Sequence, residues 1–274
     1  MEKKRVLFVS QEISPFLTKS NIANTSLRIA QSTQEEGKEI RVFTPRYGSI
    51  NERRHQLHEV IRLSGLNISI DDQDHPLIIK VASVAAAKMQ VYFIDNDDFF
   101  RRKDSLSNED GVSFKDNDER SIFFVRGVLE TLKKLGWQPD VIHCHGWFTG
   151  IMALYIKHFY KKDPHFKETK IVYHLYNDSF TDMLDLRLPQ KLAFDGFPKS
   201  VTDAIKKPDF ETFTQLILNH CDGATLAEPL NNPKLKKIYS ELNIPKLEYI
   251  EEADQSKAFS AFFNGIIDDT LVVK

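Results

Sequence analysis

Short apolar runs alternate along this chain with longer segments of helical periodicity, and this alternation restricts the possible folds more than any other feature. Continuous apolar runs predict buried strands at 6–9, 40–43, 78–81, 91–94, 141–145, 170–175 and 223–226. Helical spacing predicts helices at 21–37, 118–135, 151–160, 210–217 and 233–242. Strand–helix–strand order predicts an α/β fold, a Rossmann-like doubly wound parallel sheet with flanking helices. We expect 78–81 and 91–94 to form a hairpin-like excursion.

The clearest predicted helix is 118–135. Apolar residues recur on one face from Ile122 to Leu132, and Gly136 follows the last turn. We expect Asp116 or Asn117 to cap the first turn.

In doubly wound sheets, ligands bind outside the carboxyl ends of the strands. That rule selects the loops 10–21, 95–116, 146–149 and 176–180 as the edge where a site should lie. The segment 95–118 is polar and contains Gly111, so we expect a long surface loop there.

Composition excludes several classes of function. The chain has 274 residues, 41% of them hydrophobic, and a net charge of −2, which does not favour nucleic acid or an anionic membrane as partner. Its two cysteines, Cys144 and Cys221, cannot make a disulfide framework, so we expect a cytoplasmic protein. The apolar run 6–9 is too short for a signal peptide or a membrane span.

Five short motifs follow one another in the first part of the chain. They are SQEISPFLTKSNIAN at 10–24, PRYG at 45–48, VYFIDN at 91–96, DNDER at 116–120 and LGWQPDVIHCHGW at 135–147. In this order they resemble the glycogen and starch synthases, whose motifs read S-E-x-x-P-x-x-K-T-G-G-L-A-D, P-R-Y-G, V-Y-F-I-D-N, D-N-x-E-R and L-G-W-x-P-D-V-V-H-A-H-D-W.

The resemblance implies half of a GT-B glycosyltransferase, in which two Rossmann-like domains enclose donor and acceptor. Family members transfer glucose from ADP-glucose or UDP-glucose to an α-1,4-glucan. We expect 1–274 to be a single domain of the N-terminal type, with 257–274 as a C-terminal tail and the second GT-B domain absent. Asn264-Gly265-Ile266-Ile267-Asp268 resembles the N-G-I-D that leads into the family's second domain. Because the face where that domain would lie should expose apolar surface unless the tail covers it, we expect the residues after Asn264 to fold back on the domain.

The H-A-H-D-W motif supplies the candidate catalytic residue. By resemblance, His145 takes the position that contacts the transferred sugar, and Trp147 is retained as a candidate ligand-binding residue. Gly146 replaces the family's aspartate and Phe148 the histidine that follows Trp147. Trp147 is open to two interpretations, packing at a strand end or the mouth of a cleft.

Two other candidate ligand-binding segments differ from the family pattern. Thr18 falls on the family's lysine, Lys19 lies one residue later, and Ser20 and Asn21 replace the paired glycines that let backbone N–H groups approach a diphosphate. Lys19 either binds an anion or is a solvated loop residue. At a later strand end the family's I-H-N reads Leu175-Tyr176-Asn177, so that tyrosine replaces histidine and the asparagine stays.

A metal site is not predicted. His143 and His145 alternate on one strand and could share a metal, but no third ligand has suitable spacing. The first strand is not followed by G-x-G-x-x-G, which argues against a dinucleotide cofactor. We therefore predict neither a metal nor a cofactor.

Two hypotheses about function follow. In the first, the chain is a degenerate, catalytically impaired family member that binds a glucan, a nucleotide sugar or a protein partner in glycogen metabolism. In the second, it is an active glucosyltransferase component completed by a separate second domain or by self-association.

Overall fold

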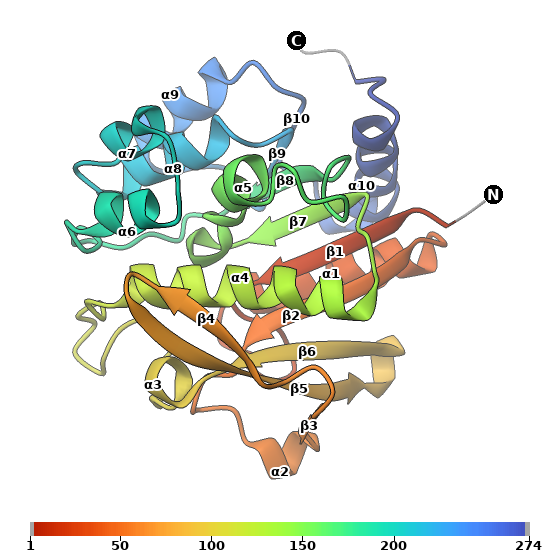
Figure 1. Ribbon diagram of the computed structural model, residues 1–274. Helices are drawn as coiled ribbons and strands as arrows, with labels where there is room; N and C mark the ends of the chain where they lie inside the picture. Colours follow the sequence, from red (N-terminus) through yellow and green to blue (C-terminus); the bar gives the residue numbers. More distant parts are fainter. Residues whose placement is uncertain (1–2, 272–274) are drawn as a thin grey trace.

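A ten-stranded sheet forms the centre of the computed structural model, which describes residues 3–271 (Figure 1). Its strand order is β10-β9-β8-β7-β1-β2-β6-β5-β3, and β4 pairs with β5. The strands are β1 (Arg5–Ser10), β2 (Glu39–Pro45), β3 (His58–Glu59), β4 (Leu66–Ile70), β5 (Gln73–Val84), β6 (Met89–Asp95), β7 (Val141–His145), β8 (Lys170–Leu175), β9 (Gly223–Leu226) and β10 (Lys246–Leu247).

Helices and helical turns connect these strands. They are α1 (Asn21–Glu35), α2 (Glu52–His55), η1 (Ala85–Ala87), α3 (Asp97–Phe100), α4 (Asn117–Leu135), η2 (Trp147–Thr149), α5 (Met152–Leu154), η3 (Tyr155–Phe159), α6 (Leu188–Phe194), α7 (Lys199–Ala204), α8 (Phe210–Leu218), α9 (Pro233–Glu241) and α10 (Glu252–Ile267).

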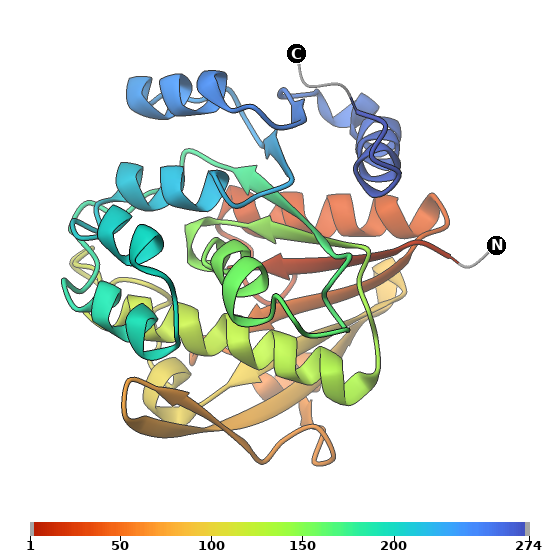
Figure 2. The same cartoon turned by 45° about the horizontal axis from the view of Figure 1, so that its top comes forward.

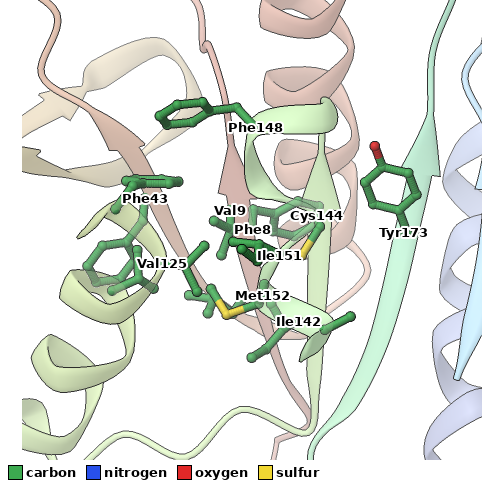
Figure 3. Close-up of a cluster of buried hydrophobic side chains, with 14 of the residues drawn as sticks. Phe8, Val9, Phe43, Val125, Ile142, Cys144, Phe148, Ile151, Met152 and Tyr173 are labelled. Carbon is green, nitrogen blue, oxygen red and sulfur yellow. The ribbon is translucent and has the colours of Figure 1, made fainter. Parts of the chain in front are cut away.

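The seven strands from β6 across β2 and β1 to β10 are parallel, which confirms the predicted fold class. β1 lies between β2 and β7, and its apolar run Val6–Val9 is fully buried, because helices cover both faces of the sheet. Figure 3 shows one side of this core, where Val9, Ile142 and Cys144 pack together with Ile151 and Met152.

The predicted hairpin is present and is longer than the sequence indicated. β5 and β6 pair antiparallel through η1, with Ile79 opposite Ile94. β5 continues well beyond the apolar run 78–81 and also pairs with β3 and β4. The antiparallel strands therefore occupy one end of an otherwise parallel sheet.

Two helices distant in sequence lie side by side on one face of the sheet, and α4 and α5 cover the other (Figure 2). The first pair is α1 and α10, joined by an ion pair of 2.6 Å between Arg28 Nη1 and Glu252 Oε1. From α10, Phe263 packs against Phe8 of β1, with ring centroids 6.3 Å apart.

The C-terminal segment differs from the expected tail. Residues 257–267 belong to α10, which begins at Glu252. This segment is a packed helix and not a tail, because its aromatic side chains are buried. Fold-back after Asn264 is confirmed for the described residues: Ile266 is buried, and Lys4 Nζ lies 2.8 Å from Asp268 Oδ2. The remaining predicted tail residues, 272–274, lie outside the described part of the chain.

The segment 95–118 is not simply a long surface loop. It contains α3, whose N-cap Asn96 accepts hydrogen bonds from the backbone N–H groups of Asp98 and Phe99, and whose Phe99 and Phe100 are buried. The predicted side-chain cap of α4 is wrong as well. Asp116 is the N-cap residue, but its carboxylate pairs with Arg102 at 2.6 Å instead of capping the helix.

Candidate functional site

All four loops selected from the sequence meet at one cavity of about 250 Å³ beside the carboxyl ends of the central strands. The residues that line it are Gln11, Glu12, Ser105, Leu106, Ser107, Gly111, Ser113, Trp147, Asp178, Ser179, Phe180 and Thr181. The loops meet there because β1, β7 and β8 are parallel neighbours, so their carboxyl ends share one edge.

The order of connection along the sheet reverses between β1 and β7, and the site begins at this point. The backbone N–H of Gln11, just after β1, donates to the carbonyl of His145 at the end of β7 over 3.0 Å. Gln11 Oε1 in turn accepts the backbone N–H of Phe148 at 3.2 Å. The Gln11 side chain is therefore fixed across the end of β7.

The Gln11 side chain packs directly against the backbone of Gly146. Gly146 has φ 84° and ψ 153°, a backbone conformation that is essentially restricted to glycine. A Cβ atom at this position would lie 2.8 Å from Gln11 Oε1 and 2.9 Å from Gln11 Cβ. The space that an aspartate side chain would enter at position 146 is thus filled by Gln11.

Asp178 places a carboxyl group in the same region from the loop after β8. Burial, followed by the charges of Glu12 and Glu228, raises the pKa of Asp178 to about 7, while hydrogen bonds from the Gln11 side chain and the Trp147 backbone lower it. Asp178 Oδ2 is buried and has no hydrogen-bond partner among the described residues. The carboxyl group therefore loses its proton less readily than that of an exposed aspartate.

Glu12 adds a second carboxylate. Its carbonyl accepts the hydroxyl of Ser10 at 2.5 Å and that of Ser26 at 3.1 Å, and its Oε1 accepts the Ser105 hydroxyl at 3.3 Å. Among the described residues that line the cavity, none is lysine, arginine or histidine. The cavity is therefore acidic and rich in hydroxyl groups.

His145, the candidate catalytic residue, is fully buried behind this edge. Its Nδ1 lies 2.7 Å from the hydroxyl of Tyr176, and its Nε2 lies 3.0 Å from Nδ1 of His143. Burial lowers its pKa to about 3, so the ring is neutral. With both ring nitrogens hydrogen-bonded inside the protein, the side chain does not face a ligand in this conformation.

The hydrogen-bonded chain continues from His143 under α10. His143 Nε2 lies 3.4 Å from Thr225 Oγ1, which is 2.5 Å from Nδ1 of His174. The ring of Phe259 in α10 packs against His143 and His174, with its centroid 5.6 Å from each. Burial, followed by the neighbouring His145, lowers the pKa of both histidines well below the ordinary value.

The predicted anion-binding loop lies directly before α1. Thr18, Lys19 and Asn21 are exposed, whereas Ser20 is half-buried and is the N-cap, its hydroxyl accepting the N–H of Ala23 at 3.1 Å. The Asn21 amide oxygen accepts the hydroxyl of Thr25 at 3.0 Å. One donor at the helix N-terminus is thus already satisfied by the protein's own side chain.

Trp147 and Asn177 are held by neighbouring residues. Trp147 lines the cavity but is only 3% exposed, and it packs edge-on against Phe180 with centroids 4.8 Å apart. The backbone N–H of Asn177 donates to Glu228 Oε1 at 3.0 Å, its amide nitrogen donates to the Pro229 carbonyl, and its amide oxygen accepts the N–H of Asn231. Trp147 therefore both packs at the strand end and forms part of the cavity wall. Asn177 links the loop after β8 to the loop after β9 through its hydrogen bonds.

Gln11 and Asp178 were not among the residues selected from the sequence. A signal existed for Asp178, a carboxylate shortly after a buried strand at the ligand edge. Gln11 had none, because its role depends on the missing side chain at Gly146. Among residues 3–271, no group of three histidine, cysteine or acidic side chains could hold a metal ion. Within the same range, no helix has the length and apolarity needed to cross a bilayer.

Comparisons with known proteins agree with this architecture. Residues 5–229 match the family model described as the starch synthase catalytic domain. A glycogen synthase of Chlorobium limicola is 38% identical over 202 residues, which cover 73% of this chain and 40% of that protein. A glycogen synthase of Pelodictyon phaeoclathratiforme is 32% identical over 264 residues, covering 96% of this chain and 53% of that protein. This chain thus spans about half or less of the length of these relatives.

A solved structure with the same fold is the catalytic domain of starch synthase IV from Arabidopsis thaliana, bound to ADP and acarbose. It superposes with a TM-score of 0.71 at 18% identity, over 92% of this chain and 53% of that one. At this identity the similarity concerns the fold.

Proposed function

Because this chain belongs to the glycogen/starch synthase family, we propose that it binds an α-glucan at the carboxyl edge of its sheet and is impaired in binding a nucleotide sugar and in glucosyl transfer. The observation that carries the proposal is the cavity at that edge, which has carboxylate and hydroxyl groups on its walls and no basic residue among those described.

Impaired donor binding follows from charge and from the loop before α1. A diphosphate requires cations or free backbone N–H groups, and a transferase needs fixed positive charge around its leaving group. Here the acidic residues Glu12 and Asp178 line the cavity at the carboxyl edge of the sheet. The Ser20 hydroxyl already accepts a hydrogen bond from the Ala23 N–H in the first turn of α1. Both features oppose an anion.

Glucan binding follows from the same groups. Sugar hydroxyls donate to carboxylates and exchange hydrogen bonds with serine and threonine, and aromatic walls suit the apolar faces of the sugar rings. The starch synthase IV structure that shares this fold was solved with ADP and acarbose bound, and the acarbose is compatible with this proposal.

Calorimetric titration with maltoheptaose, ADP-glucose, UDP-glucose and ADP, followed by a glucosyl-transfer assay, tests the proposal. A glycogen synthase from the family serves as positive control. We expect binding of maltoheptaose and little binding or turnover of either nucleotide sugar. Turnover at a rate comparable with the control, or no glucan binding, would refute it.

Restoring the paired glycines should increase nucleotide-sugar affinity. The double variant Ser20→Gly, Asn21→Gly frees backbone N–H groups at the start of α1, and charge-assisted hydrogen bonds to a diphosphate should raise ADP-glucose affinity by about tenfold or more. The loss of helix stability should stay near 1 kcal/mol, because glycine is tolerated at the N-cap and costs little in the first turn.

The matched control is Asn232→Gly, which removes the side-chain cap of α9, a helix that contributes no residue to the cavity. It should leave ADP-glucose affinity unchanged. Unchanged affinity in the double variant as well would show that the side chains at positions 20 and 21 do not limit donor binding.

A second candidate function is an active transferase component completed by a second domain or another subunit. Exposed apolar side chains in or beside the loops that line the cavity favour it: Val112 and Met183 are each 56% exposed and Leu186 is 61% exposed. Such side chains suit a covering partner. Co-purification with a GT-B-type partner, together with turnover by the complex, would favour this candidate over the first.

A further inference from the structure

We propose that Asp178, held in place by Gln11, supplies the ligand-binding carboxylate of the cavity. This carboxylate accepts a hydrogen bond from a hydroxyl group of a single glucosyl unit. This inference rests on the proposed glucan binding and names the residue that performs it. Asp178 lies outside the motifs through which the chain resembles its family.

In this chain the acidic side chain near the end of β7 comes from the loop after the neighbouring strand, β8. The family motif carries aspartate at the position of Gly146, directly after β7, and here Gln11 fills that space. Asp178, after β8, lines the same cavity as Gln11 and Trp147, the residue next to Gly146, and interactions with both lower the pKa of its carboxyl group. The chain therefore keeps an acidic group at the end of β7 but supplies it from a different loop.

The Asp178 carboxylate has an oxygen atom that can still accept a hydrogen bond from a ligand. A carboxylate accepts up to about four hydrogen bonds, and buried oxygen atoms in proteins almost always have a donor. Asp178 Oδ2 has none among the described residues. The terminal torsion of an aspartate has a broad minimum, so rotation about Cβ–Cγ can turn this oxygen toward the cavity that the residue lines.

The remaining walls determine the ligand class. Glu12 repels anions, and the described residues hold no group that could bind a metal ion. The hydroxyl groups of Ser105, Ser107 and Thr181 suit a neutral polyhydroxyl molecule. The volume of about 250 Å³ lies below the usual range for drug-sized ligands, so one sugar ring is the appropriate size.

The experiment compares Asp178→Asn with Asp182→Asn, an exposed aspartate of the same loop. The amide has the same shape as the carboxylate but loses one acceptor and the charge. We expect Asp178→Asn to weaken maltotriose binding by about 10- to 100-fold, the range for hydrogen bonds to a charged group, and Asp182→Asn to leave it unchanged. Gln11→Ala, which frees the carboxyl group without removing it, should have a smaller effect of the same sign.

A second measurement separates a binding role from a structural one. Urea unfolding followed by circular dichroism should give nearly the same midpoint for Asp178→Asn as for the unmodified protein, because the amide has the shape of the carboxylate. Loss of maltotriose affinity together with a large fall in the unfolding midpoint would indicate a folding defect and overturn the inference.

The outcomes distinguish the two proposals. If the unmodified protein binds maltotriose and Asp178→Asn binds it equally well, the role of Asp178 is refuted and glucan binding stands. If the unmodified protein binds neither maltotriose nor maltoheptaose, the proposed function fails, and this inference with it. Selective loss of maltotriose affinity in Asp178→Asn supports both.

Discussion

Replacing Gly146 with aspartate, the residue of the family motif, is expected to destabilise the protein by about 3–5 kcal/mol. The backbone conformation at this position costs any other residue about 1–3 kcal/mol, and overpacking against Gln11 adds a similar amount. A buried carboxylate near Asp178 adds repulsion. Urea unfolding followed by circular dichroism measures the loss.

Two further variants separate the causes. Gln11→Ser in the Gly146→Asp background should recover about 1–2 kcal/mol, because it removes the clash and leaves the backbone strain. Gly37→Ala is the matched control: Gly37 also has a positive φ, of 87°, but a Cβ there would meet no atom within 4 Å. It should cost only about 1–2 kcal/mol. Equal losses at positions 146 and 37 would show that Gln11 does not fill the site.

Lys191→Met should destabilise the protein by about 3–5 kcal/mol. Lys191 Nζ lies 2.7 Å from Asp118 Oδ2, 2.7 Å from Glu119 Oε1 and 2.8 Å from Asp185 Oδ2. The side chains of Lys191 and Asp118 are 1% and 0% exposed, and burial raises the pKa of Asp118 to about 6 even with the lysine present. Removing the cation leaves this carboxylate buried without its partner. Equilibrium urea unfolding at pH 7.5 tests this.

Lys206→Met is the control, since Lys206 pairs with Asp203 at 2.8 Å on the surface, with side chains 70% and 58% exposed. It should change stability by less than about 0.5 kcal/mol. Adding Asp118→Asn to Lys191→Met should recover part of the loss, because no buried charge then remains unpaired. A loss near that of Lys206→Met would mean that the buried pair contributes little.

The parallel part of the fold was predictable from the sequence because each central strand is a continuous apolar run covered on both faces. The same rule placed the four ligand loops, since the carboxyl ends of parallel strands share one edge. Helix α10 was not predicted, although Phe259, Phe262, Phe263 and Ile266 have the i, i+3, i+4, i+7 spacing of a helical stripe, because this segment was interpreted as a tail. Likewise, Phe99 and Phe100 of α3 lie in a polar segment, and only Asn96 marks the start of that helix.

The site was predicted less completely. The buried surroundings of His145 include Tyr176 and Phe8, which come from elsewhere in the chain. Likewise, Asp178 gains its role from Gln11, its neighbour across a strand end. Motifs locate a backbone position, whereas the exposure and partners of its side chain are determined by long-range packing.

The three buried histidines, His143, His145 and His174, make folding a proton-linked reaction. In the unfolded chain their pKa values return to about 6.5, while in the folded protein burial holds all three rings neutral well below that pH. Unfolding in mildly acidic solution therefore takes up protons, and the free energy of unfolding falls as the pH drops below about 6.5. These histidines resemble a group for acid–base catalysis, but their expected effect is to make the folded protein less stable in acid.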